Sequence, residues 1–136
     1  MTDSSDSPVT ELTEQECWHL LSDHEVGRLA TTAGGVLDIF PITYVIDNKT
    51  LVFRTGPGTK LIELTINENV AFEIDYYDET EGYSVVIHGQ AEQLDTMSEK
   101  DIAASLPLTS LFPTDRPRFV RIHPQAITGR RFRRSS

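Results

Sequence analysis

The sequence predicts a mainly β protein in which antiparallel strands close into a barrel. Seven strand-like runs follow one another along the chain, and only two or three short helix-like segments interrupt them. Turn residues such as Gly34-Gly35 and Asp47-Asn48-Lys49 separate neighbouring runs by a few positions, as in a meander. Strands in that order favour an antiparallel barrel over a parallel sheet with helical crossovers.

Each element is predicted from its local pattern. A helix is expected to begin after Thr13, because this residue and Glu16 can form a capping box, and to end at 23–25. The pattern predicts strands at 26–32, 36–46, 50–55, 70–76, 83–94, 118–123 and 126–132, with short helices at 60–66 and 98–106. Pro41 requires a strand edge or a bulge, because it has no N–H to donate. Gly89 indicates a bulge or the close approach of another segment.

Length and composition predict a single soluble domain. The chain has 136 residues, of which 38% are apolar and 24% charged. We expect a disordered tail at 1–9, one domain at 10–132 and a basic tail at 133–136. No apolar run approaches the roughly 20 residues that span a bilayer, and no signal segment is visible, so a cytoplasmic protein without membrane association is expected. No Cys/His cluster has zinc spacing, and the single Cys17 is expected to be buried.

The net charge of −9 hides an asymmetry along the chain. Residues 116–136 contain seven Arg and no Asp or Glu, so the remainder of the chain carries −16. An acidic body would repel a nucleic-acid backbone, so no nucleic-acid partner is expected. The arginines are expected instead to serve a local anion or the acidic surface of a partner subunit.

The stretch VFRTGPGTKL, residues 52–61, is a candidate anion site. Its order of Gly, Thr and Lys does not match the P-loop, so an NTPase is excluded. A strand nevertheless delivers Arg54 and Thr55 to a Gly-Pro-Gly loop, and Thr59 and Lys60 begin the next helix-like segment. Amide N–H groups at a helix start, two hydroxyls and two cationic side chains suit a phosphate dianion. A plain strand-to-helix turn with solvated side chains is the alternative.

The order of the motifs VGRLATT, FPITYVID, VFRTGPGTKL, VAFEIDYYD and YSVVIHGQAEQL resembles the pyridoxamine 5'-phosphate oxidase-like family of FMN-binding split barrels. The resemblance covers about residues 12–94. It implies a six- or seven-stranded antiparallel split barrel that forms a homodimer, with FMN between the two subunits. It places the flavin phosphate at the 54–60 loop and the ring system along Pro41, Ile42 and Thr43. It also gives the strand YSVVIHGQA a role in dimer contact.

The C-terminal ITGRRF carries a further hypothesis. Arg130 or Arg131 is proposed to cross the dimer interface toward the partner's flavin or an anionic substrate, with Gly129 permitting a turn. Arg131 is the residue we name for cofactor binding. Two lone histidines, His88 and His123, are expected to be structural or exposed rather than catalytic. Trp18 is expected to be a core residue of an amphipathic helix, with a ligand pocket as the alternative.

The resemblance implies a flavin-dependent oxidoreductase whose substrate is unknown. No acid–base pair or nucleophile stands out, which fits a cofactor that performs the chemistry itself, and no catalytic side chain is named. The substrate-binding residues of true pyridoxamine phosphate oxidases beyond ITGRRF are absent, so that activity is not expected. Two alternatives remain: a reductase that uses the deazaflavin F420, with Arg28 and the C-terminal arginines binding its acidic tail, and a non-catalytic flavin- or haem-binding module.

Overall fold

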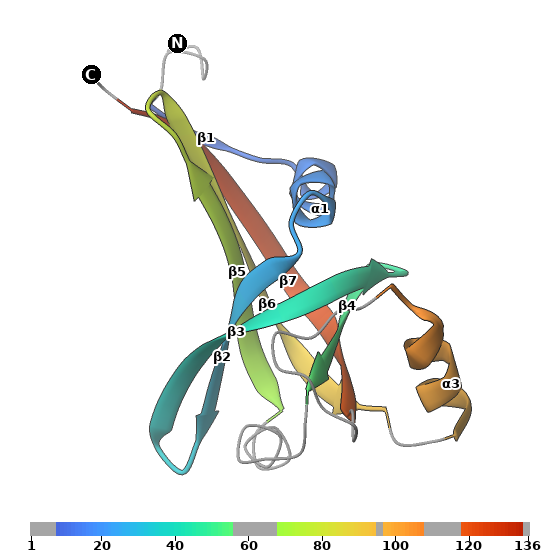
Figure 1. Cartoon of the computed structure of the whole chain (residues 1–136). Coiled ribbons are helices and arrows are strands. Elements are labelled where there is room, and N and C mark those ends of the chain that lie inside the picture. The colour runs from blue at the N-terminus through green and yellow to red at the C-terminus, as the bar shows by residue number, and fades with distance from the viewer. Residues whose placement is uncertain (1–7, 56–67, 95–96, 108–117, 135–136) are drawn as a thin grey trace.

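The computed structural model describes residues 8–55, 68–94, 97–107 and 118–134, which form a closed antiparallel barrel of β-strands (Figure 1). The strands are β1 (Val9–Glu11), β2 (Val26–Ala33), β3 (Val36–Asp47), β4 (Thr50–Thr55), β5 (Asn69–Tyr77), β6 (Glu81–Gln93) and β7 (Arg118–Arg133). Their order in the sheet is β1-β7-β4-β3-β2-β5-β6, and β6 also pairs with β7. That last pairing joins six strands into a ring and leaves β1 outside it, along the edge of β7. The predicted split barrel is confirmed.

Two positive-φ hairpins set the register of the first half of the barrel. Gly34 and Gly35, with φ of +59° and +80°, reverse the chain between β2 and β3, so that Ala33 lies opposite Val36. Asn48 and Lys49, with φ of +50° and +58°, do the same between β3 and β4. Both are two-residue turns of the kind that matches the twist of paired strands.

The core fills the barrel with side chains that alternate along each strand. On β5, Val70, Phe72 and Ile74 are at most 6% exposed, as the alternation predicts. Their neighbours across β6, Val85 and Ile87, are fully buried. The opposite face of the same strands is therefore on the outside of the barrel, where a ligand or a partner can bind.

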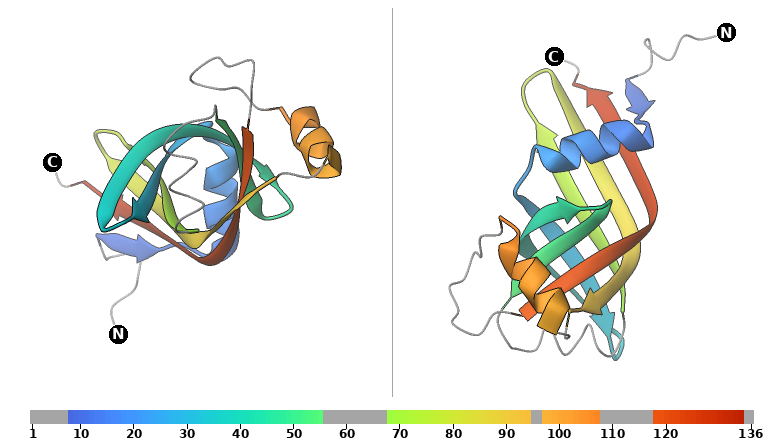
Figure 2. Two further views of the ribbon diagram at one scale, coloured as in Figure 1. Left: turned by 90° about the horizontal axis from the view of Figure 1, so that it is seen from below. Right: turned by 90° about the vertical axis from the view of Figure 1, so that its right-hand side faces the viewer.

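Two helices complete the described part of the fold. Helix α1 (Glu14–Ser22) begins with the predicted capping box, in which Thr13 Oγ1 accepts from the Glu16 N–H at 3.1 Å. Its buried Cys17, Leu20 and Leu21 belong to the barrel core, so α1 covers one end of the barrel (Figure 2). Helix α3 (Met97–Ser105) lies against the outside of the sheet, where Ala103 packs in a cluster with Val52, Leu94 and Phe119.

The two strand irregularities predicted from single residues are confirmed. Pro41 pairs with Arg28 of β2. It precedes Tyr44, the first residue of β3 that pairs with β4, so the other side of Pro41 is a local edge of the sheet. Gly89 lies at a register shift between β6 and β7. A Cβ at Gly89 would lie 2.4 Å from the carbonyl oxygen of His123, which explains why only glycine fits.

Four expectations need correction or lie outside the described residues. Val9 begins β1 rather than ending a disordered tail, because residues 9–11 pair with 130–132. The two predicted C-terminal strands are one continuous β7. Gly129 makes no turn: it lies within β7, where a Cβ would come 2.6 Å from the Sγ of Cys17. The predicted helix at 60–66 falls outside the described part of the chain.

Candidate functional site

The structure brings three of the predicted cofactor-binding residues together on neighbouring strands. Tyr44 of β3 lies opposite Phe53 of β4, and both side chains are buried in the core. One residue along each strand, Thr43 and Arg54 are therefore directed away from the core, to the outer face of the barrel. Thr55 follows at the end of β4. This arrangement places hydroxyl and guanidinium donors together where β4 leaves the sheet.

The Thr43–Arg54 region is largely shielded from solvent. Thr43 is 7% exposed, and the Nε of the half-buried Arg54 is itself buried. Thr55, at the end of β4, pairs with Arg118 of β7, so a second arginine is located beside this end of β4. Low local dielectric strengthens the interaction of such donors with an anion. Thr59 and Lys60, the other two predicted phosphate ligands, lie outside the described residues.

A cavity of about 420 Å³ opens beside Thr43. It is lined by the end of α1, the loop before β2, the second half of β3 and a residue shortly after α3: Leu21, Ser22, His24, Glu25, Thr43, Tyr44, Val45, Ile46 and Pro107. Its lining combines apolar walls with a few polar groups, which is the usual character of a small-molecule site. We call it the Thr43 cavity.

The other two residues predicted on β3 are exposed to different degrees. Pro41 is exposed on the outer face, next to Arg28. Ile42 is 6% exposed and its side chain belongs to the core. Any contact of Ile42 with a ligand would therefore be made by its backbone.

Arg131 does not join this group within one subunit. It lies in β7 opposite Tyr83 and Thr10, whereas Arg54 pairs with Phe119 near the start of the same strand. Phe119 and Arg131 are twelve positions apart, which corresponds to about 40 Å of extended strand. Arg131 instead binds Glu81, with Nη1 3.2 Å from Oε1, and its guanidinium carbon lies 5.8 Å from the centre of the Tyr83 ring.

Arg28, the other arginine considered for an acidic ligand, is already paired. Its Nη2 lies 2.6 Å from both Glu73 Oε1 and Asp75 Oδ1, on the outer face beside Pro41. Burial, reinforced by a hydrogen bond with Asp75, raises the pKa of Glu73. Two carboxylates thus compensate this one guanidinium, which leaves it little capacity for a further anion.

The polar residues that sequence reasoning missed are His24 and Tyr44, which line the Thr43 cavity, and Tyr83, which contacts His24. The Nε2 of His24 lies 2.6 Å from the hydroxyl of Tyr83, and the two rings meet edge to face. The hydroxyl of Tyr44 donates to the carbonyl oxygen of Leu21, and burial raises the pKa of Tyr44 well above its usual range. His24 and Tyr83 are 59 positions apart, and no local pattern in the sequence indicates that they meet.

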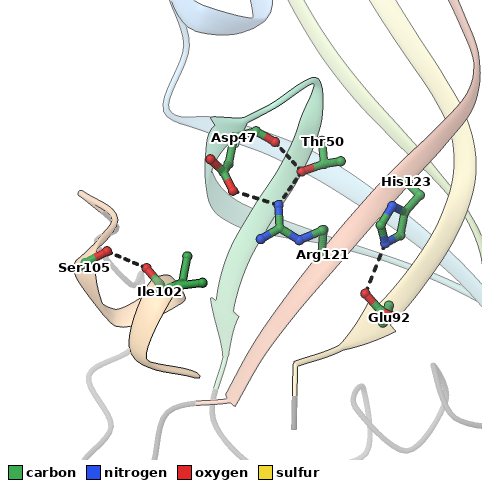
Figure 3. Close-up of polar contacts among 7 residues, drawn as sticks. All are labelled: Asp47, Thr50, Glu92, Ile102, Ser105, Arg121 and His123. Carbon is green, nitrogen blue, oxygen red and sulfur yellow. Dashed lines mark hydrogen bonds and ion pairs between the residues drawn. The ribbon is translucent and has the colours of Figure 1, made fainter. Parts of the chain in front are cut away.

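The remaining candidates are placed as expected. His88 is exposed, and His123, also exposed, lies with Nε2 3.1 Å from Glu92 Oε1 (Figure 3). Cys17 is fully buried, and burial raises the pKa of its thiol. Within the described ranges there is no group of three or more metal-binding side chains, and no helix there has the length and apolarity to cross a membrane.

Comparison with known proteins agrees with the fold and decides the family. The family model described as pyridoxamine 5'-phosphate oxidase matches residues 13–131. The chain belongs to the pyridoxamine 5'-phosphate oxidase family. An uncharacterized protein from Mycobacterium tuberculosis is 37% identical over 92 residues, which cover 65% of this chain and 81% of that protein.

Two of the similar solved structures are named as FAD-binding proteins. The FAD-binding protein of Mycobacterium smegmatis is 42% identical, with a TM-score of 0.78 and coverage of 92% of this chain and 99% of that one. A FAD-binding protein of Mesorhizobium loti is 25% identical, with a TM-score of 0.80 and coverage of 90% and 97%.

Proposed function

We propose that this protein is a flavin-dependent oxidoreductase that holds the phosphate of FMN at the end of β4. The observation that carries the proposal is the placement of Thr43 and Arg54 on the outer face of the barrel, with Thr55 following at the end of β4 and the Thr43 cavity beside Thr43. The names of the two FAD-binding relatives support a flavin. A bound flavin would supply hydride transfer, so the protein has to bind, orient and tune it.

The chemistry of the donor set fits a flavin phosphate. The Arg54 guanidinium can bind two phosphate oxygens as a fork, and Thr55 can donate a third hydrogen bond. The sequence adds Thr59 and Lys60 directly after the Gly-Pro-Gly loop. The backbone of Pro41, Ile42 and Thr43 is proposed to contact the polar edge of the ring system. The protein's role in the reaction is then to position the ring and exclude water rather than to provide a catalytic acid or base.

The active form is proposed to be a homodimer. Leu37 and Ile39 are 81% and 67% exposed, and strand alternation places them with Pro41 on the outer face of the β2–β3 hairpin. Apolar side chains gathered on one strand face mark an interaction surface. A second copy covering this surface would bring another wall toward Pro41 and Thr43. Arg131 is proposed to reach the partner's flavin site, since it is remote from the site of its own subunit.

Two other cofactors compete with FMN for the same site. FAD is favoured by the names of the relatives, and it would need room for a second phosphate and an adenosine. F420 would need free cationic groups for its acidic tail, and the pairing of Arg28 with Glu73 and Asp75 counts against one of them. A haem-binding module finds little support, because Cys17 is buried and His88 is exposed.

The deciding experiment is a fluorescence titration of the purified protein with FMN, FAD, riboflavin and F420. We expect FMN to bind at one per subunit, with riboflavin at least about tenfold weaker, because the phosphate makes charge-assisted hydrogen bonds. Arg54→Ala and Lys60→Ala should weaken FMN about tenfold or more and leave riboflavin unchanged. Lys100→Ala, which removes a cation from α3, is the matched control. Equal affinities for FMN and riboflavin would overturn the proposed phosphate site.

Turnover is tested separately from binding. The flavin-loaded protein should be reduced by NADH or NADPH and reoxidised by a small acceptor such as a quinone or a nitroaromatic compound. Tight binding without reduction by either nucleotide would leave a flavin-binding module in place of the oxidoreductase.

A further inference from the structure

A second hollow of about 670 Å³ lies between α1 and the β3–β4 turn. It is lined by Glu14, Gln15, Trp18, Ser22, Ile46 and Lys49. Ser22 and Ile46 also line the Thr43 cavity, so the two hollows are neighbours. We call this second hollow the Trp18 groove. No step of the proposed flavin function uses it.

Trp18 and Ile46 form the apolar part of the Trp18 groove. Trp18 and Ile46 are both half-buried and pack against the barrel core with one side, which leaves the other side to line the groove. The indole N–H of Trp18 is directed to Glu14, with Nε1 3.5 Å from Oε1. An indole that lines a hollow can pack against an aromatic ring, which is favourable beyond the burial of apolar area alone.

Lys49 supplies the charge at the rim, and its backbone is unusual. It is the second central residue of the β3–β4 turn, at φ +58°, where turns of this type prefer Asn followed by Gly. The chain has the preferred Asn48 but a lysine in place of the glycine, in a left-handed conformation that is unfavourable for a side chain. Such an outlier at a cavity points to a function for the side chain.

The ammonium of Lys49 is available to a ligand. In the described ranges it makes no ion pair and no side-chain hydrogen bond. The nearby carboxylate of Asp47 is bound to Arg121, with a distance of 2.9 Å between Oδ2 and Nη1, and that of Glu14 faces Trp18 (Figure 3 shows the Asp47 pair). The Asp47 carboxylate therefore has a cationic partner, and the Glu14 carboxylate accepts from the indole N–H of Trp18.

We propose that the Trp18 groove binds a planar aromatic carboxylate. The aromatic ring lies against Trp18 and Ile46, and the carboxylate pairs with the ammonium of Lys49. The inference rests on the groove alone and holds whether or not the Thr43 cavity receives a flavin. It assigns a ligand class to this face of α1 that the proposed cofactor site leaves unexplained.

The single tryptophan of the chain makes a direct test possible. Fluorescence of Trp18 is followed, in protein free of flavin, during titration with 4-nitrobenzoate, which quenches indole, and with its neutral isostere 4-nitrobenzamide. We expect saturable quenching by the acid, with the amide at least about fivefold weaker because it lacks the charged pair with Lys49. Linear quenching that matches free N-acetyltryptophanamide, or equal affinities for acid and amide, would overturn the proposal.

Two variants check that Lys49 is responsible. Lys49→Gly suits the turn, so its melting temperature should equal or exceed that of the parent protein, while its affinity for 4-nitrobenzoate falls to that for the amide. Lys100→Ala removes one positive charge from α3 and should leave the titration unchanged. Unaltered affinity in Lys49→Gly, or an equal loss in Lys100→Ala, would show that the groove does not recognise the carboxylate through Lys49.

Discussion

Arg121 of β7 reaches across β4 to Asp47 at the end of β3, with Nη1 2.9 Å from Oδ2 (Figure 3). The same Nη1 donates to Thr50 Oγ1 at 2.6 Å. Thr50 in turn donates to the carbonyl oxygen of Asp47. One guanidinium thus ties three strands together at the turn that carries Lys49.

Replacing this guanidinium should destabilise the protein. We expect Arg121→Ala to lower the free energy of unfolding by about 1–2 kcal/mol, because the half-buried Asp47 and Thr50 lose a charged donor. Urea unfolding followed by circular dichroism measures the change. Arg118→Ala, at the exposed start of the same strand, should cost less than about 0.5 kcal/mol. Equal effects of the two variants would contradict a specific role for Arg121.

The contact between Gly129 and Cys17 predicts a coupled pair of mutations. A Cβ at Gly129 would lie 2.6 Å from Cys17 Sγ and 3.0 Å from Leu12 Cδ1, so Gly129→Ala should cost about 1–3 kcal/mol through overpacking. Adding Cys17→Ala removes the sulfur and should recover part of that loss. A double-mutant cycle of unfolding free energies measures the coupling. Strictly additive losses would mean that the backbone, not the sulfur, resists the methyl group.

Asp78 should make the stability of the β5–β6 hairpin depend on acid pH. Its Oδ1 accepts hydrogen bonds from the N–H groups of Glu81 and Thr80, both at 2.8 Å, and these bonds lower its pKa from 3.8 to about 2. A carboxylate with a lowered folded-state pKa stabilises the protein above its unfolded pKa, and this contribution is lost as the pH falls toward the folded value.

The variant Asp78→Ala isolates that contribution. Its melting temperature should lie below that of the parent at about pH 6, and the difference should shrink as the pH is lowered from about 4 toward 2. Asp78→Asn, which keeps an acceptor oxygen but no charge, should show a smaller deficit that also shrinks over this range, because the titrating carboxylate belongs to the parent. A deficit of Asp78→Ala that stays constant across this range would contradict the role of the charge.

The proposed homodimer predicts that a charge on the β2–β3 hairpin separates the subunits. Ile39→Glu should convert the protein to monomers in sedimentation velocity, because a buried unpaired carboxylate is costly at an interface. Ile102→Glu is the matched control, since Ile102 of α3 is also exposed, at 55% compared with 67% for Ile39. A monomeric parent protein, or a dimer that survives Ile39→Glu, would remove this surface from the proposal.

The strands could be predicted because their signals are local. The turns at Gly34-Gly35 and Asn48-Lys49 and the alternation at Val70, Phe72 and Ile74 depend on neighbours in the sequence, and each is confirmed. Strand β1 could not be predicted in the same way. Residues 9–11 carry no period of their own and become a strand only because 130–132 provide an edge to pair with.

The site was harder to predict than the fold for the same reason. The resemblance pointed to β3 and β4, and the structure places Thr43 beside Arg54 as the strand pairing requires. Arg131 is far from that group because β7 is one long strand, whereas the sequence suggested two shorter strands. The turn expected at Gly129 was wrong because the glycine is required by packing against Cys17 rather than by backbone conformation.

The ring of strands has a consequence for how the chain acquires its fold. β7 supplies the partner for both β4 and β6, yet it is the last strand of the ring to be synthesised (Figure 1). Until residues 118–133 emerge from the ribosome, both of those strands present open edges that can pair with other chains. A nascent chain stalled before residue 118 should therefore be a preferred client of chaperones, whereas the finished barrel offers them far less unpaired backbone.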